Sequence, residues 1–291
     1  MAAGRIAAPV RRAPPPTSPR RYNTAIEDQP DTPIELRDIE PLRLLLAHQP
    51  LAILSDIDGT LAPIVSEPAS ARASDRASAA LQSLAERGAQ VALITGRSPD
   101  QARRMIGIPS ASYATNHGLT IRLGGDEWTS PEVEPYVEKA VCVLAEIGSI
   151  DVPGVTVENK GPILAIHYRN TPSESEALAA IEAALQRSPT AGEFTRHGAR
   201  KVIELRPPLP LNKGTAATAI LAHLAPAAVV CMGDDLTDID LFDAVRASGI
   251  PCAVVAVEND EQQDVMEAAD YYVRGVEGVE RLLEDILTAI P

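Results

Sequence analysis

Aromatic residues, cysteines and long apolar runs are all scarce in this sequence of 291 residues. Only 3% of the residues are aromatic, so the core must be built mainly from Ala, Val, Leu and Ile. Cys142, Cys231 and Cys252 are widely spaced in apolar runs, which favours reduced core thiols in the cytoplasm over disulfides or a metal cluster. No apolar run approaches the roughly 18 residues needed to cross a bilayer, so we expect no membrane association.

Positive charge is scarce as well, because 26 Lys and Arg stand against 40 Asp and Glu, for a net charge of -14. A broad nucleic-acid surface needs a basic stripe, so we expect no nucleic-acid partner. An anionic small molecule remains compatible, since a bound cation and one or two lysines can reverse the charge locally. Residues 1–35 differ from the rest: they are rich in Pro, Ala and Arg and lack the apolar segment of a secretory signal. We predict a disordered N-terminal tail there.

Strand and helix signals alternate along most of the chain. Five segments have the composition of buried parallel strands: 51–57, 91–94, 111–115, 227–232 and 253–257. Helix signals lie between and after them, starting at Ser74, Ser98, Asn212, Thr237 and residue 276. This alternation predicts a doubly wound, Rossmann-like α/β domain with a parallel sheet.

The pattern differs in the middle of the chain. An amphipathic helix is predicted at 131–147, with a buried face made of Val133, Val137, Ala140, Val141 and Leu144. Strands at 155–157 and 163–168, a helix at 171–187 and a hairpin at 194–206 turning at His197-Gly198 follow. We therefore predict a core domain of residues 36–122 and 207–291, into which an α+β cap domain of residues 123–206 is inserted.

Reactive side chains follow several predicted strands, and ligands of open α/β sheets bind beyond the carboxyl ends of their strands. The first group is Asp56-Ile57-Asp58-Gly59-Thr60. Residues two apart in an extended chain face the same side, so Asp56 and Asp58 can both point at one ligand. Gly59 would allow a sharp turn, and Thr60 offers a hydroxyl and an N–H. Alone, the segment is also compatible with a simple turn.

Three further strand or helix ends carry such groups. Thr95-Gly96-Arg97 offers a hydroxyl for a phosphate oxygen, although it could be an ordinary loop. Lys213 would lie at a helix N-terminus, where a cation is unfavourable unless an anion is close, although a surface lysine is the simpler interpretation. Asp234 and Asp235 would repel each other at a buried strand end unless they bind a divalent cation. Thr237 and Asp238 are also explained as a helix cap and a first-turn acid.

Together, the four segments supply what phosphoryl transfer requires. A phosphate monoester is a dianion, and its uncatalysed hydrolysis is so slow that enzymes accelerate it by up to about 10²¹. A carboxylate can approach the phosphorus only when this charge is neutralised, which a magnesium ion and Lys213 would do. The sequence therefore predicts a magnesium-dependent site for phosphoryl transfer at this edge of the sheet.

The four segments resemble the haloacid dehalogenase superfamily of phosphatases. Asn116-His117-Gly118 and, in the insert, residues 157–161 (VENKG), 167–169 (HYR) and 201–207 (KVIELRP) resemble the trehalose-6-phosphate phosphatase family, over roughly residues 40–290. This resemblance implies hydrolysis of trehalose 6-phosphate to trehalose and phosphate through an aspartyl-phosphate. The chain departs from the usual family residues at six positions that spare the expected catalytic groups: Ser55, Ile57, Thr95, Thr115, Thr120 and Ile239.

The resemblance also implies a role for each site residue. Asp56 would be the nucleophile, Asp58 would protonate the leaving oxygen and then activate water, and Lys213 would hold the phosphate. Mg²⁺ would be bound or supported by Asp56, the Asp58 carbonyl, Asp234, Asp235 and Asp238. Substrate would contact residues of both predicted domains: Gly59, Thr60, Thr95, Gly96, Arg97, Asn116, His117, Glu158, Lys160, Arg169 and Glu204.

Other functions share parts of this pattern. The same core could act on sucrose phosphate or a mannosyl phosphoglycerate, or belong to a mutase with a similar cap. A phospho-acceptor signalling domain also pairs Asp, Thr and Lys, but it needs neither a second acid at Asp58 nor a large insert. A catalytically dead regulatory domain would be expected to lose a core acid or the lysine, and all are present. We expect a cytoplasmic monomer whose partner is a small sugar phosphate.

Overall fold

The computed structural model describes residues 32–290, apart from 66–69, 125, 200 and 260–262. Most of the predicted tail, residues 1–31, lies outside the described residues. Its last residues contradict the expectation of disorder, because Ile34–Glu35 forms strand β1, which pairs in parallel with β13 (Tyr271–Arg274). A two-residue strand is too short to leave a recognisable pattern in the sequence.

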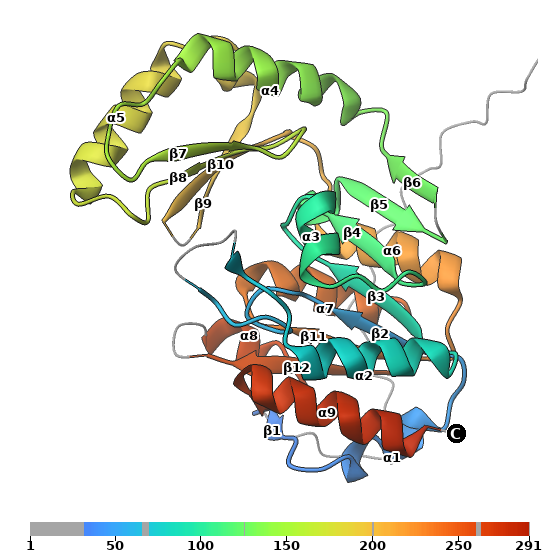
Figure 1. Ribbon diagram of the computed structural model, residues 1–291. Coiled ribbons are helices and arrows are strands. Elements are labelled where there is room, and N and C mark those ends of the chain that lie inside the picture. Colours follow the sequence, from blue (N-terminus) through green and yellow to red (C-terminus); the bar gives the residue numbers. More distant parts are fainter. Residues whose placement is uncertain (1–31, 66–69, 125, 200, 260–262, 291) are drawn as a thin grey trace, which may run out of the picture.

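A nine-stranded sheet runs through the larger part of the molecule (Figure 1). Its other strands are β2 (Leu51–Ser55), β3 (Gln90–Ile94), β4 (Ser112–Thr115), β5 (Thr120–Leu123), β6 (Asp126–Thr129), β11 (Ala228–Gly233) and β12 (Cys252–Glu258). The helices around it are α1 (Arg43–Leu46), α2 (Asp75–Glu86), α3 (Pro99–Met105), α6 (Lys213–Leu224), α7 (Leu236–Ala247), α8 (Gln263–Glu267) and α9 (Gly275–Ala289).

The order of strands in this sheet is β1-β13-β12-β11-β2-β3-β4-β5-β6. All pairs from β1 to β4 are parallel, and β5 and β6 are added antiparallel at one edge. Helices α2 and α9 bury apolar side chains against one face, and α6 and α7 against the other. The predicted doubly wound α/β architecture is confirmed.

A second, four-stranded antiparallel sheet has the order β7-β8-β10-β9. We call residues 134–206 the cap; its elements are α4 (Glu134–Ile147), β7 (Thr156–Asn159), β8 (Leu164–His167), α5 (Glu174–Gln186), β9 (Thr195–Ala199) and β10 (Val202–Arg206). Helices α4 and α5 share one apolar cluster with β8 and β10. The boundary predicted at residue 123 needs correction, because β5 and β6 hydrogen-bond into the central sheet and carry that sheet to Thr129.

Two local predictions in the cap are wrong. The predicted inner residues Val137 and Val141 are 41% and 55% exposed, whereas Ala140, Val143 and Ile147 are buried. Apolar residues occupy two overlapping stripes of α4, and only the packing against the sheet decides between them. The hairpin turns between β9 and β10 rather than at residues 197–198, because both of those residues pair with β10.

The three cysteines are free, but only Cys231 is fully buried; Cys252 is intermediate and Cys142 is exposed on α4, which corrects the prediction of three core thiols. Every helix in the described part of the chain is too short or too polar to cross a bilayer.

Candidate active site

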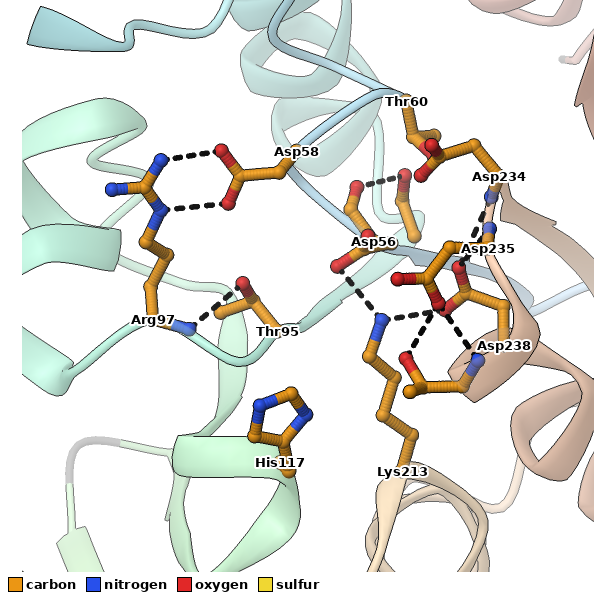
Figure 2. A network of polar contacts seen from close by, with 12 residues as sticks. Asp56, Asp58, Thr60, Thr95, Arg97, His117, Lys213, Asp234, Asp235 and Asp238 are labelled. Atoms are coloured by element: carbon orange, nitrogen blue, oxygen red, sulfur yellow. Dashed lines mark hydrogen bonds and ion pairs between the residues drawn. The ribbon is translucent and has the colours of Figure 1, made fainter. Parts of the chain in front are cut away.

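The predicted reactive segments meet at the carboxyl edge of the central sheet. Strand β2 lies between β3 and β11, so the loops that begin at Asp56, Thr95 and Asp234 are neighbours in space. Helix α6 brings Lys213 to the same edge, where Asn212 caps the helix and its side chain accepts from the backbone N–H of Thr215 at 2.9 Å. Figure 2 shows Asp56, Lys213, Asp234 and Asp238 facing one another.

Lys213 lies between two carboxylates. Its Nζ is 3.2 Å from Asp56 Oδ1 and 2.7 Å from Asp238 Oδ1, and the three side chains are 3%, 6% and 0% exposed. Burial would lower the pKa of Lys213, but the two carboxylates outweigh this and hold the pKa well above its usual value. Burial also raises the pKa of Asp56, and the charges of Asp238 and Asp234 add to that rise while Lys213 opposes it. One lysine therefore leaves this acidic group short of positive charge.

Asp56, Asp234 and Asp238 form a compact group of oxygen ligands. One carboxylate oxygen from each lies within 4.8 Å of the others, and all three residues are buried. Asn259, which follows β12, donates from Nδ2 to the Asp234 carbonyl at 2.8 Å. Asn259 was not predicted as a site residue, although it directly follows a buried strand, as Asp56, Thr95 and Asp234 do.

Asp235 and Asp238 shape the start of α7. Asp235 is the N-cap of this helix, and its Oδ1 accepts from the backbone N–H and the hydroxyl of Thr237, both at 2.7 Å. The alternative assignment of Thr237 as the cap is therefore wrong. Asp238 Oδ2 accepts from the backbone N–H of Asp234 at 3.0 Å and of Asp235 at 3.1 Å. With Oδ1 on Lys213, both carboxylate oxygens of Asp238 have partners.

The turn after β2 approaches Asp234 closely. Gly59 has φ +83°, and a Cβ at this position would lie 2.0 Å from Asp234 Oδ2. Only glycine combines this backbone conformation with the close approach. Thr60 is buried, and its hydroxyl donates to Asp234 Oδ1 at 3.4 Å. Gly59 and Thr60 thus position an acid of the site.

Asp58 is held away from the lysine by Arg97 (Figure 2). Arg97 donates from Nε to Asp58 Oδ2 at 2.7 Å and from Nη2 to Oδ1 at 2.5 Å, a two-pronged ion pair. The backbone N–H of Arg97 also donates to the Thr95 hydroxyl at 3.2 Å. Thr95 is buried and lies near Asp56 (Figure 2). The Arg97 guanidinium, which was predicted to bind substrate, faces Asp58 instead.

Asn116 and His117 connect the core to the cap. Both have left-handed backbone angles, with φ +52° and +58°, which is unusual for residues other than glycine. The His117 ring lies against Gly96, where a Cβ would be 2.4 Å from Cε1. Across the boundary, Arg206 Nη2 lies 2.9 Å from His117 Nε2, and Asn116 Nδ2 donates to the Lys160 carbonyl at 3.1 Å.

Two of the four predicted sugar-binding residues of the cap, Lys160 and Glu204, lie at this contact between core and cap. Lys160 Nζ is 2.8 Å from Glu204 Oε1 and 3.5 Å from the Gly96 carbonyl. Burial would raise the pKa of Glu204, but contacts with His117, Lys160 and Arg206 outweigh it and lower that pKa. Arg206 is a contact that the sequence argument did not single out.

Glu158 and Arg169 reach the core at other points. Glu158 accepts from Gln101 Nε2 at 2.5 Å and pairs with His167 Nε2 at 2.9 Å. Burial would raise the pKa of Glu158, but the hydrogen bond with His167 and the nearby charge of Lys160 outweigh it and lower that pKa. Arg169 donates to the Val65 carbonyl at 2.8 Å. Gln101 was not singled out from the sequence, and His167 was named only as part of the motif 167–169, without a role.

The fold is that of haloacid dehalogenase-like hydrolases. A hydrolase of this kind from Bacteroides thetaiotaomicron superposes with a TM-score of 0.56 at 15% identity, covering 80% of this chain and 98% of that one. The trehalose-phosphatase family model matches residues 54–276, and the chain belongs to this family.

Individual relatives agree with this assignment. The trehalose-phosphate phosphatase of Mycobacterium avium (strain 104) is 34% identical over 270 residues, which cover 83% of this chain and 64% of that protein. This chain thus matches less than two thirds of that relative's length. The trehalose-6-phosphate phosphatase of Aspergillus fumigatus superposes with a TM-score of 0.59 at 26% identity, covering 89% of this chain and 99% of that one. The C-terminal domain of the C. albicans enzyme gives a TM-score of 0.68 at 24% identity, covering 88% and 98%.

Proposed function

We propose that the protein is a magnesium-dependent phosphatase that hydrolyses trehalose 6-phosphate to trehalose and phosphate through an aspartyl-phosphate on Asp56. The observation that carries this proposal is the buried Asp56–Lys213–Asp238 arrangement, with Asp234 close enough to share a cation with Asp56. A nucleophilic carboxylate, a fixed positive charge and a place for a divalent ion are the parts that phosphoryl transfer needs.

The residues present suit Mg²⁺. Hard divalent cations prefer carboxylate and carbonyl oxygens, and Asp56 and Asp234 offer carboxylates while Asp58 has its backbone carbonyl in the same turn. Asp235 and Asp238 support the site through the hydrogen bonds that hold its loop. A bound Mg²⁺ would polarise a phosphoryl oxygen and offset the negative charge that Lys213 leaves uncompensated.

The chain's own residues account for the proton and bond changes. Lys213 and the Thr95 hydroxyl would hold the phosphate while Asp56 attacks phosphorus and the bond to the sugar oxygen breaks. Asp58 would give its proton to that oxygen, so that trehalose leaves neutral. Asp58 would then take a proton from water as the water attacks the aspartyl-phosphate, which releases phosphate and restores Asp56.

Recognition of the sugar is assigned to the cap. Residues 134–206 would form a lid that excludes water during the reaction. Glu158, Lys160 and Glu204 are charged and lie along the boundary with the core, where they could bond to sugar hydroxyls. Arg169 would contribute from the side near Val65. The named activity of the M. avium, A. fumigatus and C. albicans relatives supports the choice of trehalose 6-phosphate. A location in the cytoplasm is also proposed, which the free cysteines suit. The monomer stays a prediction.

A panel of sugar phosphates tests this function. Phosphate release should be fastest with trehalose 6-phosphate in the presence of Mg²⁺ and should stop in excess chelator. Asp56→Asn should fold normally and lose turnover, because an amide is not a nucleophile. A stable phosphoprotein without repeated turnover would instead favour a phospho-acceptor domain, and equal turnover of sucrose phosphate would remove the assigned specificity.

A further inference from the structure

The segment 96–101, which leads into α3 and forms its first turn, contacts both the proposed acid and the cap. On the core side, Arg97 grips the Asp58 carboxylate through two hydrogen bonds. On the cap side, Lys160 Nζ reaches the Gly96 carbonyl at 3.5 Å, and Glu158 accepts from Gln101 at 2.5 Å. Two cap residues therefore rest on the short stretch of chain that positions Asp58.

Gln101 joins these contacts through the two ends of one amide. Its Oε1 accepts from the backbone N–H of Ser98 at 3.2 Å, and the Ser98 hydroxyl accepts from the backbone N–H of Gln101 at 3.4 Å. This reciprocal pair is a capping box that fixes the first turn of α3. The Nε2 end donates to Glu158 of the cap. The amide group is planar. The bond to Glu158 and the capping box with Ser98 therefore hold the Gln101 side chain in one orientation.

The contact with Glu158 is a charge-assisted hydrogen bond. The other oxygen of Glu158 pairs with His167 Nε2 at 2.9 Å. This contact lies within the cap and orients the carboxylate towards Gln101. Hydrogen bonds to an ionised partner are roughly twice as strong as neutral ones. Gln101 is thus a firm point of attachment for a cap that must open to admit substrate.

We propose that Gln101 is a positioning residue that couples closure of the cap to the placement of Asp58. When Glu158 bonds to Gln101, segment 96–101 is held from both sides, and with it the Arg97 guanidinium that fixes the position of the Asp58 side chain. When the cap opens, the bond is lost and Asp58 is held less firmly. This proposal rests on the proposed function and explains how binding of the sugar reaches the chemistry.

Gln101→Glu separates the two roles of this side chain. Glutamate is the usual partner of serine in a capping box, so the bond to the Ser98 N–H survives. A second carboxylate would, however, face Glu158 and repel it. Arg104→Gln is the matched control, because Arg104 is exposed on the same helix and its replacement changes the net charge by the same amount.

Energy transfer between two dyes reports the position of the cap in the ligand-free protein. One dye is attached to the exposed Cys142 on α4, the other to Asp285→Cys on α9, with Cys252→Ser to avoid a third label. Gln101→Glu should shift the population towards longer distances, and Arg104→Gln should not. Adding Glu158→Gln to Gln101→Glu should restore the short distance, because the amide and the carboxylate are then exchanged. Equal distributions for Gln101→Glu and Arg104→Gln would overturn the proposal.

Kinetics test the link to Asp58. Gln101→Glu should lower kcat for trehalose 6-phosphate by about 10-fold or more, from the strength of a hydrogen bond to a charged group. In the first turnover of p-nitrophenyl phosphate, release of p-nitrophenol needs no proton from Asp58 and precedes the attack of water, so its rate should change by less than about twofold. Equal losses on both substrates would overturn the coupling to Asp58. If the unmodified protein does not hydrolyse trehalose 6-phosphate, the proposed function fails, while the dye distances still decide whether Gln101 holds the cap.

Discussion

His117 should remain neutral well below the pH at which an ordinary histidine gains a proton. Its side chain is 16% exposed, and burial lowers its pKa from 6.5 to about 4, with Glu204 opposing and Arg206 adding to the effect. Glu204 Oε2 lies 3.2 Å from Nε2 and would favour a charged ring, but Arg206 lies closer, at 2.9 Å. The neutral ring accepts from Arg206 at Nε2 only when its proton is on Nδ1, because Arg206 can only donate.

The stability of the protein should therefore fall on acidification. A histidine whose pKa is lowered by folding binds its proton more readily in the unfolded chain. Its contribution is fully present above pH 6.5 and is lost as the pH falls towards about 4, the folded-state value. Between about pH 7 and about pH 4.5, this group alone should remove about 2 kcal/mol from the free energy of unfolding, at about 1.4 kcal/mol per pKa unit.

Urea unfolding of the natural protein and of His117→Asn at these two pH values measures the effect. Asparagine tolerates the left-handed backbone at this position and does not titrate, so the variant should lose about 2 kcal/mol less on acidification. The other titrating groups contribute to both proteins and largely cancel in the difference. NMR titration of the ring gives the pKa directly, and a His117 signal that titrates near or above 6.5 would refute the reasoning.

Three further predictions concern close contacts of the site. Gly96→Ala should cost about 1–3 kcal/mol of stability and reduce turnover, because its Cβ would lie 2.4 Å from the His117 ring, while Gly192→Ala has open space and serves as the control in thermal unfolding. Gly59→Ala should weaken Mg²⁺ binding, measured by calorimetry, at least tenfold more than Gly88→Ala, which shares a positive φ but has no atom within 4 Å. Glu204→Gln should lower the free energy of unfolding by about 1.5–3 kcal/mol, because it weakens hydrogen bonds to the partly buried Lys160 and Arg206, whereas the exposed Glu138→Gln should change it little.

The sequence predicted the central sheet well because its signals are local. Apolar runs placed β2, β3, β4, β11 and β12 within about two residues, the usual uncertainty of strand ends. Ser98 caps α3 as expected, and α6 begins directly after Asn212, where its helix pattern was predicted to start. The buried face of α4 and the edge strands β5 and β6 were missed, because they depend on what packs beside them.

In the candidate site, too, the features with a local sequence pattern were predicted and those that depend on packing were not. Strand ends predicted that Asp56, Lys213 and Asp234 would meet, since parallel strands bring their carboxyl ends to one edge. The sequence did not predict which side chains pair with each other. Arg97 with Asp58 and Gln101 with Glu158 are two examples. Such pairs join residues 39 and 57 positions apart and depend on rotamers that no local pattern specifies.

The position of β2 next to β11 has a consequence for how the protein is made. Leu51 pairs with Ala228, so the strand that precedes Asp56 cannot gain this neighbour until most of the chain has left the ribosome. The cap, by contrast, is built from neighbouring strands and helices of one continuous segment and can fold early. Pairings between distant residues form slowly because a long loop must close first. During synthesis, the cap should therefore be complete before β2 and β11 bring Asp56 and Asp234 together.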